Sequence, residues 1–243
     1  AVAWDSGIVE SAQSVLVVYE GKELKAETAY SVSVEVVDNH GNTANAKMMF
    51  ETGIFDNMNF SAKMITHDFP EKETSCPVFE KVFEVEKEVA KARLYVTAHG
   101  VYEISLNGVR AGDYRMAPGW TSYHHRLQYQ VYDVTQMLSE NNRIEIAVGN
   151  GWYKGILGFD CKPNRYGDRI GAFAELHIAY ADGTMDIVCT DESWKVRTSE
   201  IRYSEIYMGE TIDTDEPEIL TSKAVIQRFD KSVLTAQENI LLP

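Results

Sequence analysis

The sequence predicts an all-β protein: a partial fibronectin-III or immunoglobulin-like sandwich, followed by a larger β-sandwich of the jelly-roll type. Three observations support this fold class: alternating apolar and polar residues, Asn-Gly and Asp-Gly turn signals between the alternating segments, and sparse helical periodicity. Alternation gathers apolar residues on one face, because successive side chains of a strand point to opposite faces. Short strands with frequent turns and few helices are typical of sandwiches and jelly rolls.

The alternation is clearest in four segments, each expected to form a strand with one buried face: Tyr30–Val37, Ala92–Ala98, Arg143–Val148 and Ala172–Tyr180. Turn signals lie between strand-like segments at residues 39–42, Asn107-Gly108 and Asp182-Gly183. Asn-Gly and Asp-Gly favour hairpins because both turn residues tolerate positive φ. The clearest helical signal is a single turn over Asp133–Leu138, which Asp133 or Thr135 is expected to cap.

A boundary between two domains is expected near residues 52–62. Residues 1–54 hold four strands at most, whereas a complete sandwich has about seven, so they are expected to be the C-terminal part of a fibronectin-III-like domain. Residues 60–215 are long enough for a full β-sandwich core, and 216–243 are expected to link to further domains, since both ends look cut. The short first domain exposes unpaired strand edges, which favour a homodimer or docking on the larger domain.

Composition and charge exclude several classes of function. The 243 residues are 44% hydrophobic and 25% charged, which excludes wholesale disorder. Acidic residues outnumber basic ones by 37 to 23, giving a net charge of −14 without a basic run. Nucleic-acid and anionic-membrane partners are therefore not expected, because both need clustered Lys and Arg. No apolar run approaches the roughly 20 residues that span a bilayer.

Aromatic and amide side chains in Gly-containing loops are the candidate carbohydrate-binding residues: Asn107, Trp120, Tyr123, Asn150, Trp152 and Tyr153. A flat ring can cover the C–H face of a pyranose, while amide groups reach its hydroxyls or a cation. Two alternatives remain open. The aromatic rings can instead fill the ends of the sandwich core, and Asn107 can simply form a hairpin turn.

Metal binding is not expected, and no cofactor is predicted. The oxygen-bearing residues Asp160, Asn164 and Asp168 are the weak calcium candidates, but their spacing is not that of an EF-hand, and a solvated loop is the alternative. The three cysteines, Cys76, Cys161 and Cys189, match no zinc or redox spacing. Unpaired thiols favour a cytoplasmic location, with a secreted or periplasmic one left open.

The ordered set of motifs over residues 60–215 resembles the N-terminal β-sandwich domain of bacterial α-L-rhamnosidases of glycoside hydrolase family 78. The segments that carry this resemblance include Ala92–Gly108, Pro118–Tyr123, Tyr132–Thr135, Gly149–Tyr153, Tyr180–Gly183 and Ile206–Glu210. Residues 1–54 resemble the latter part of the fibronectin-III-like domain that these enzymes carry first, through Trp4–Gly7, Tyr19–Gly21 and Phe50–Gly53.

The resemblance implies an accessory region of an enzyme that removes terminal α-L-rhamnose from glycosides with inversion. The catalytic acids of this family lie in an (α/α)₆ barrel that nothing here matches, so this chain is expected to hold no catalytic residue and to be inactive alone. Its implied partners are a rhamnosylated glycoside or L-rhamnose, and the parent enzyme's own catalytic domain. Some related modules bind rhamnose through calcium with Asp and Asn ligands, but here Leu106 precedes Asn107.

Three functions are compatible with these observations. The first is a scaffold that packs on the catalytic barrel. The second is a carbohydrate-binding module with its own rhamnose site, which predicts an exposed Trp120 or Trp152. The third is an autonomous enzyme or an unrelated adhesion protein, which needs two converging carboxylates or a strongly perturbed acid.

Overall fold

The computed structural model describes residues 1–215 and 218–237. The chain forms two compact units, one over Ala1–Asn59 and the other beginning at Phe60. In the described ranges, no helix is long and apolar enough to cross a membrane.

Unit 1 is built on one antiparallel hairpin, β1 (Ala29–Val37) and β2 (Thr43–Glu51), and ends in the single turn η1 (Asn57–Asn59). This confirms the strand predicted over Tyr30–Val37. The Asp38 carboxylate closes the turn by accepting hydrogen bonds from the backbone N–H groups of His40 and Asn42, both at 2.8 Å. These bonds lower the pKa of Asp38, together with the amide hydrogen bond from the Asn42 side chain, which has the largest effect.

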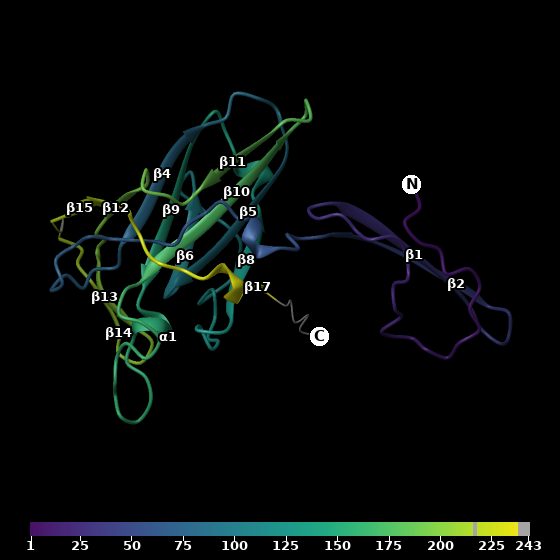
Figure 1. Ribbon diagram of the computed structural model, residues 1–243, viewed down its shortest axis with the longest axis horizontal. Coiled ribbons are helices and arrows are strands. Elements are labelled where there is room, and N and C mark those ends of the chain that lie inside the picture. Colours follow the sequence, from purple (N-terminus) through teal and green to yellow (C-terminus); the bar gives the residue numbers. More distant parts are fainter. Residues whose placement is uncertain (216–217, 238–243) are drawn as a thin grey trace. The chain divides into compact units, whose positions relative to one another are not determined.

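Unit 2 consists of two facing β-sheets and a separate hairpin (Figure 1). The seven-stranded sheet has the order β16-β3-β10-β5-β8-β17, with β11 paired to β10: β16 (Val225–Ile226), β3 (Ile65–Thr66), β10 (Gly171–Tyr180), β5 (Val89–His99), β8 (Leu127–Asp133), β17 (Leu234–Ala236) and β11 (Met185–Cys189). The six-stranded sheet has the order β15-β12-β4-β9-β6-β7: β15 (Thr221–Lys223), β12 (Lys195–Arg197), β4 (Val78–Glu84), β9 (Asn141–Gly149), β6 (Val101–Leu106) and β7 (Val109–Arg110).

The remaining elements of unit 2 are short. The separate hairpin pairs β13 (Ile201–Glu205) with β14 (Gly209–Ile212), and three single turns complete the set: η2 (Thr135–Met137), α1 (Gly151–Lys154) and η3 (Lys231–Val233). This arrangement confirms the predicted all-β sandwich fold.

The core lies between the two large sheets of unit 2. Leu94 and Leu176 from the seven-stranded sheet join Phe79 and Ile146 from the six-stranded sheet in one fully buried cluster. The strands predicted over Ala92–Ala98, Arg143–Val148 and Ala172–Tyr180 are confirmed as β5, β9 and β10. Alternation predicts them because each strand turns one face toward the opposite sheet.

The predicted turns are also confirmed. Asn107-Gly108 joins β6 to β7 with φ of 56° and 78°, and positive φ at both residues is what the tightest hairpin turn requires. Asp182-Gly183 joins β10 to β11. The predicted helical turn is η2, where the Asp133 carboxylate accepts hydrogen bonds from the backbone N–H and the hydroxyl of Thr135, at 3.0 and 2.6 Å.

Residues 216–243 differ from the predicted linker. Three short strands of the sandwich, β15, β16 and β17, lie in this segment, and Ala224 and Leu234 are buried among the core residues. Strands of two or three residues are too short to show alternation, so the sequence pattern misses them. Residues 216–217 and 238–243 of that predicted linker lie outside the described residues.

The segment that enters unit 2 is fastened to the outer face of the seven-stranded sheet. The fully buried carboxylate of Glu175 accepts the Ala62 N–H at 2.6 Å through Oε2, and Oε1 lies 2.7 Å from His177 Nε2. The ammonium group of Lys231 donates to the carbonyl of Phe60. Phe60 itself packs edge-on against three rings of this sheet: Tyr95, Tyr129 and Phe173.

Candidate functional site

The pairing of β6 with β9 separates the two candidate amide residues. Val101 at the start of β6 faces Gly149, whereas Leu106 at its end faces Ile144. Asn150 follows Gly149, so it lies at the opposite end of β6 from Asn107, about 20 Å away at roughly 3.3 Å per residue. The two residues therefore cannot share one sugar or one cation.

Asn107 uses its side chain to hold its own hairpin. Its amide nitrogen donates to the Met137 carbonyl at 2.9 Å and to Asn142 Oδ1 at 3.0 Å. Its amide oxygen accepts the Arg143 N–H at 2.8 Å. With φ of 56° and these three bonds, Asn107 has the geometry of a hairpin turn residue.

At the other end of β6, the loop after β7 and the loop after β9 bring the four candidate aromatic residues together. Tyr123 and Tyr153 form the inner part and are 3% and 7% exposed. The Tyr123 hydroxyl donates to the Gly119 carbonyl at 2.8 Å, and its ring meets Tyr153 edge-on at 5.4 Å. Burial raises the pKa of both hydroxyls. These two rings fill the end of the core, as one of the two alternatives anticipated.

Trp120 and Trp152 form the outer part of this cluster. Their rings are nearly parallel, with an interplanar angle of 7° and a centroid separation of 6.0 Å. Trp120 is 55% exposed, and its indole N–H donates to the Tyr166 hydroxyl at 3.2 Å. This stacked pair offers solvent a flat aromatic surface held in place by a hydrogen bond, which is a suitable support for the C–H face of a sugar.

Asn150 lies beside the tryptophan pair but bonds to a protein carboxylate. Its amide nitrogen donates to Glu205 Oε1 at 3.0 Å, while Glu205 Oε2 accepts the Ile156 N–H at 3.0 Å. Glu205 is 8% exposed and fastens the loop that contains α1 to β13. No local sequence pattern marks this role, because Glu205 is one of many acidic residues and is remote from Asn150 along the chain.

His99, the last residue of β5, also lies at this end of the sandwich. Its ring stacks on Tyr153 at 4.3 Å with an interplanar angle of 6°. His99 is 7% exposed, and its Nδ1 atom has no hydrogen-bond partner among the described residues. Burial lowers the pKa of His99 to about 4, so the imidazole is neutral at pH 7.

The calcium candidates lie in the exposed loop that follows α1. Asp160 forms ion pairs with Arg165 at 3.2 Å and with Lys162 at 3.5 Å. Asn164 and Asp168 are exposed in the same loop. Within residues 1–215 and 218–237, no group of three or more His, Cys, Asp or Glu side chains is placed to hold a metal ion.

The family models place this architecture among known proteins. Residues 87–236 match the α-L-rhamnosidase N-terminal domain, and residues 1–56 match the Rha78A-like N-terminal immunoglobulin domain. The first match alone covers more than half of the 243 residues, so the chain belongs to the family of α-L-rhamnosidase N-terminal domains.

Similar proteins agree with this family. An α-L-rhamnosidase of Formosa agariphila is 34% identical over 225 residues, which cover 86% of this chain and 24% of that protein. The crystal structure of native α-L-rhamnosidase from Aspergillus terreus matches with a TM-score of 0.85 and 32% identity, over 94% of this chain and 29% of that chain. A Streptomyces avermitilis α-L-rhamnosidase complexed with L-rhamnose matches with a TM-score of 0.56 and 28% identity, over 74% of this chain and 19% of that chain. The chain thus spans about a quarter or less of its curated relatives.

Proposed function

We propose that this chain is a non-catalytic accessory region of an α-L-rhamnosidase. The parent enzyme hydrolyses terminal α-L-rhamnose from glycosides with inversion, and its acid and base are carried by a catalytic domain outside these residues. The family match and the share of the relatives that this chain covers support the proposal.

The contacts of the candidate loop residues favour a scaffold role. The side chains of Asn107 and Asn150 bond to other protein groups, and Tyr123 and Tyr153 fill the end of the core. Residues engaged in this way stabilise loops and give them a fixed shape. In this proposal, the rigid sandwich supports the catalytic domain and shapes the approach to its active site.

Hydrolysis of nitrophenyl α-L-rhamnoside tests the accessory role. The 243-residue chain should show no activity above background, while a longer gene product that contains it should release nitrophenol. Inversion predicts that β-L-rhamnose appears first, which NMR of the fresh product detects. Turnover by the 243-residue chain alone contradicts the proposal.

A rhamnose-binding module is the second candidate, supported by the exposed Trp120 stacked on Trp152. Calorimetric titration with L-rhamnose, in calcium and again in a chelator, tests it. Saturable heat that Trp120→Ala reduces supports the module, and dependence on calcium indicates a calcium ion in the site. Tyr207→Ala is the matched control, because Tyr207 is 61% exposed on the β13–β14 loop.

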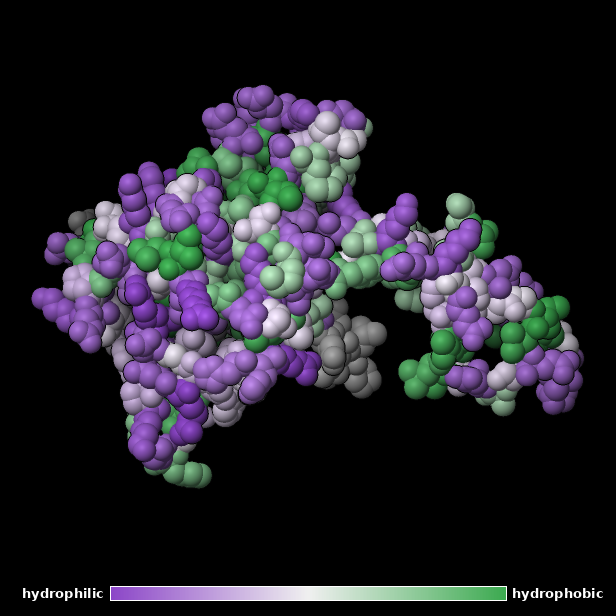
Figure 2. Space-filling model, viewed as in Figure 1, coloured by the Kyte–Doolittle hydropathy of each residue, from purple (hydrophilic) through white to green (hydrophobic). Residues whose placement is uncertain are grey.

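We also propose that the chain forms a homodimer through a surface of unit 1. One face of its hairpin is continuously apolar, with Val32, Val34 and Val36 lying opposite Met48, Ala46 and Ala44. Figure 2 shows hydrophobic residues at the surface of this unit. Sedimentation equilibrium should give a dimer that Val34→Lys converts to a monomer, and a monomer at all concentrations contradicts this part.

A further inference from the structure

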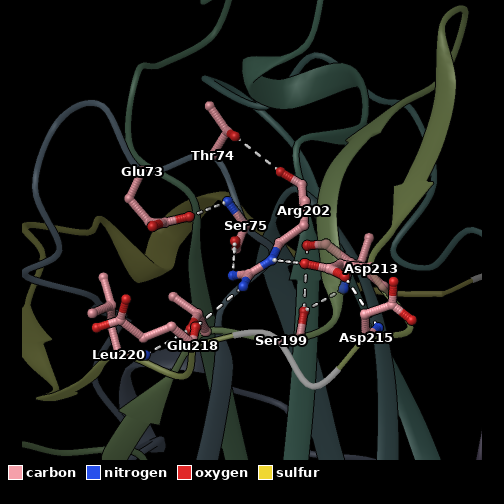
Figure 3. A network of polar contacts seen from close by, with 11 residues as sticks. Glu73, Thr74, Ser75, Ser199, Arg202, Asp213, Asp215, Glu218 and Leu220 are labelled. Carbon is pink, nitrogen blue, oxygen red and sulfur yellow. Dashed lines mark hydrogen bonds and ion pairs between the residues drawn. The ribbon is translucent and has the colours of Figure 1, made fainter.

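A small polar cavity of about 280 Å³ lies in unit 2 where the β13–β14 hairpin meets the segment before β4 (Figure 3). Six residues line it: Glu73, Thr74, Ser75, Arg202, Glu218 and Leu220. Pockets for small molecules begin at roughly 300 Å³, so this volume suits a single small polar ring rather than an extended ligand. Neither the accessory role nor the tryptophan pair uses these residues.

Arg202 is held rigidly at this cavity. Its Nη1 donates to Ser75 Oγ at 3.0 Å and its Nη2 to the Glu218 carbonyl at 3.2 Å. The Asp213 carboxylate lies 3.7 Å from Nε, and the Arg202 side chain is 25% exposed. A guanidinium has five N–H donors, and Nη1 and Nη2 each carry a second one beyond these contacts. Within residues 1–215 and 218–237 these two N–H groups have no hydrogen-bond partner, so the proposal assigns them to a ligand.

Glu73 supplies the acceptor side of the cavity. Its Oε1 accepts the Ser75 N–H at 2.9 Å, which orients the carboxylate at the edge of the cavity. The side-chain hydrogen bond with Ser75 has the largest effect in lowering the pKa of Glu73, and the charge of Arg202 acts in the same direction. Glu73 is therefore ionised at pH 7 and presents an acceptor near the fixed donors of Arg202.

Because the cavity contains both a guanidinium and carboxylates, it favours a ligand without net charge. An anion would meet the carboxylates of Glu73 and Glu218, and a cation would meet the guanidinium of Arg202. A neutral polyol satisfies both kinds of group, because each hydroxyl can accept from an arginine N–H and donate to a carboxylate. Leu220 adds an apolar wall against which the C–H groups of a sugar can pack.

We propose that this cavity binds one neutral saccharide unit, at a site separate from the Trp120–Trp152 pair. Arg202 and Glu73 hold neighbouring hydroxyls, and Thr74 and Leu220 bound the ring. The site adds a carbohydrate contact to the sandwich whether or not the tryptophan pair binds sugar.

NMR titration of the ¹⁵N-labelled 243-residue chain tests the ligand class. The probes are L-rhamnose, D-glucose and D-galactose, with D-glucuronate as the anionic sugar and D-glucosamine as the cationic one. At least one neutral sugar should give saturable shifts of the Thr74, Ser75 and Leu220 amides, at lower concentration than either charged sugar. Tighter binding of a charged sugar, or no saturable shift with any neutral sugar up to about 100 mM, overturns the proposal.

Two variants test the residues. Arg202→Lys keeps the charge but loses the planar fork and should weaken binding by about tenfold or more. Glu73→Gln keeps the size but removes the charged acceptor, at a partly exposed position where the fold tolerates the change, and should weaken binding by about fivefold or more. Unchanged affinity in Glu73→Gln overturns the proposal even if Arg202→Lys fails to fold.

The controls separate this site from the proposed function. Arg197→Lys, on β12, changes an arginine that pairs with Glu145 at 3.0 Å outside the cavity, and it should leave sugar affinity unchanged. Trp120→Ala should also leave the shifts of Ser75 and Leu220 unchanged. Loss of those shifts in Trp120→Ala would assign the binding to the tryptophan pair instead.

Discussion

The hairpin of unit 1 and the central strands of unit 2 have the same sequence pattern but very different burial. In β5 of unit 2, Leu94 and Val96 are completely buried. In β1 of unit 1, Val34 and Val36 occupy equivalent alternate positions and are 52% and 56% exposed. The difference lies in the second layer, because β5 faces the six-stranded sheet. Alternation therefore predicts a strand and its apolar face, and burial additionally requires a facing sheet.

This difference has an energetic consequence. Burial of apolar surface contributes about 25 cal/mol per Å², and a two-stranded hairpin without a covering layer is marginally stable in water. The stability of unit 2 should therefore rest on its core, whereas β1 and β2 should open readily. Four predictions test this contrast, from the largest effect to the smallest.

Amide hydrogen exchange should give the largest difference. The central amides of β5 and β10 should exchange only through global unfolding of unit 2, while those of β1 and β2 should exchange through local opening. We expect protection to be about 10⁴-fold greater in β5 and β10, measured by exchange at pH 7 with NMR detection.

Protein concentration is the control for this experiment. Protection of β1 and β2 that increases with concentration would show that a second copy covers the apolar face. Equal protection in the two units at the lowest concentration would contradict the contrast drawn here.

Removing a buried carboxylate should have the next largest effect. Glu175→Ala leaves the buried N–H of Ala62 without its acceptor and removes the hydrogen bond to His177, so it should destabilise unit 2 by about 3–5 kcal/mol. Glu35→Ala is the matched change on β1, where the side chain is exposed, and should cost less than about 0.5 kcal/mol. Urea unfolding measures both, and similar losses in the two variants would refute the comparison.

The fold could be predicted largely from the sequence, because its main strands are long enough to show alternation. The pattern identified β1, β5, β9 and β10, and the Asn107-Gly108 and Asp182-Gly183 turns. It did not single out β2, β4, β6 or β8, and it missed β15, β16 and β17, since strands of two or three residues depend on neighbours that lie far away in sequence. Hydrogen-bonded pairing with a strand that is remote along the chain leaves no local pattern in the sequence.

The candidate site was less predictable for the same reason. The loops that carry Trp120 and Trp152 could be selected by composition, but only the fold shows that the two rings stack. Ser75 and Arg202 form a hydrogen bond across 127 positions of sequence, and no local motif marks either residue. Asn107 and Asn150 were likewise both predicted to bind carbohydrate, although they lie at opposite ends of β6.

Shortening the same side chain in both units should give an intermediate effect. Val96→Ala removes two methyl groups from a fully buried position and leaves a cavity, so it should destabilise unit 2 by about 2–3 kcal/mol. In the monomer, at protein concentrations too low for the proposed dimer, Val34→Ala changes the unfolding free energy by less than about 0.5 kcal/mol, since that side chain is half-exposed. Denaturant unfolding monitored by Trp194, the fully buried tryptophan of unit 2, measures the first change, and hydrogen exchange of the β1 amides measures the second. A larger loss in Val34→Ala would indicate that a partner buries the unit 1 face.

The smallest effect is the dependence of unit 2 stability on pH. Burial lowers the pKa of His99 from 6.5 to about 4, so below pH 6.5 the unfolded chain binds a proton that the folded chain does not. Stability contributed by the neutral imidazole is therefore complete above pH 6.5 and decreases as the pH falls toward 4. Between pH 7 and pH 5, we expect a loss of about 1–2 kcal/mol from this residue.

His99→Phe isolates this contribution, because phenylalanine fills the same space beside Tyr153 and does not titrate. The variant should lose less stability than the unmodified chain between pH 7 and pH 5. It should keep part of the dependence, since burial and the nearby charges of Lys154 and Arg169 also lower the pKa of His67 to about 4. Identical curves of unfolding free energy against pH for the two proteins would mean that His99 is hydrated in the folded state. The end of the sandwich at Tyr153 would then be open to water, and less like the closed core that distinguishes unit 2 from unit 1.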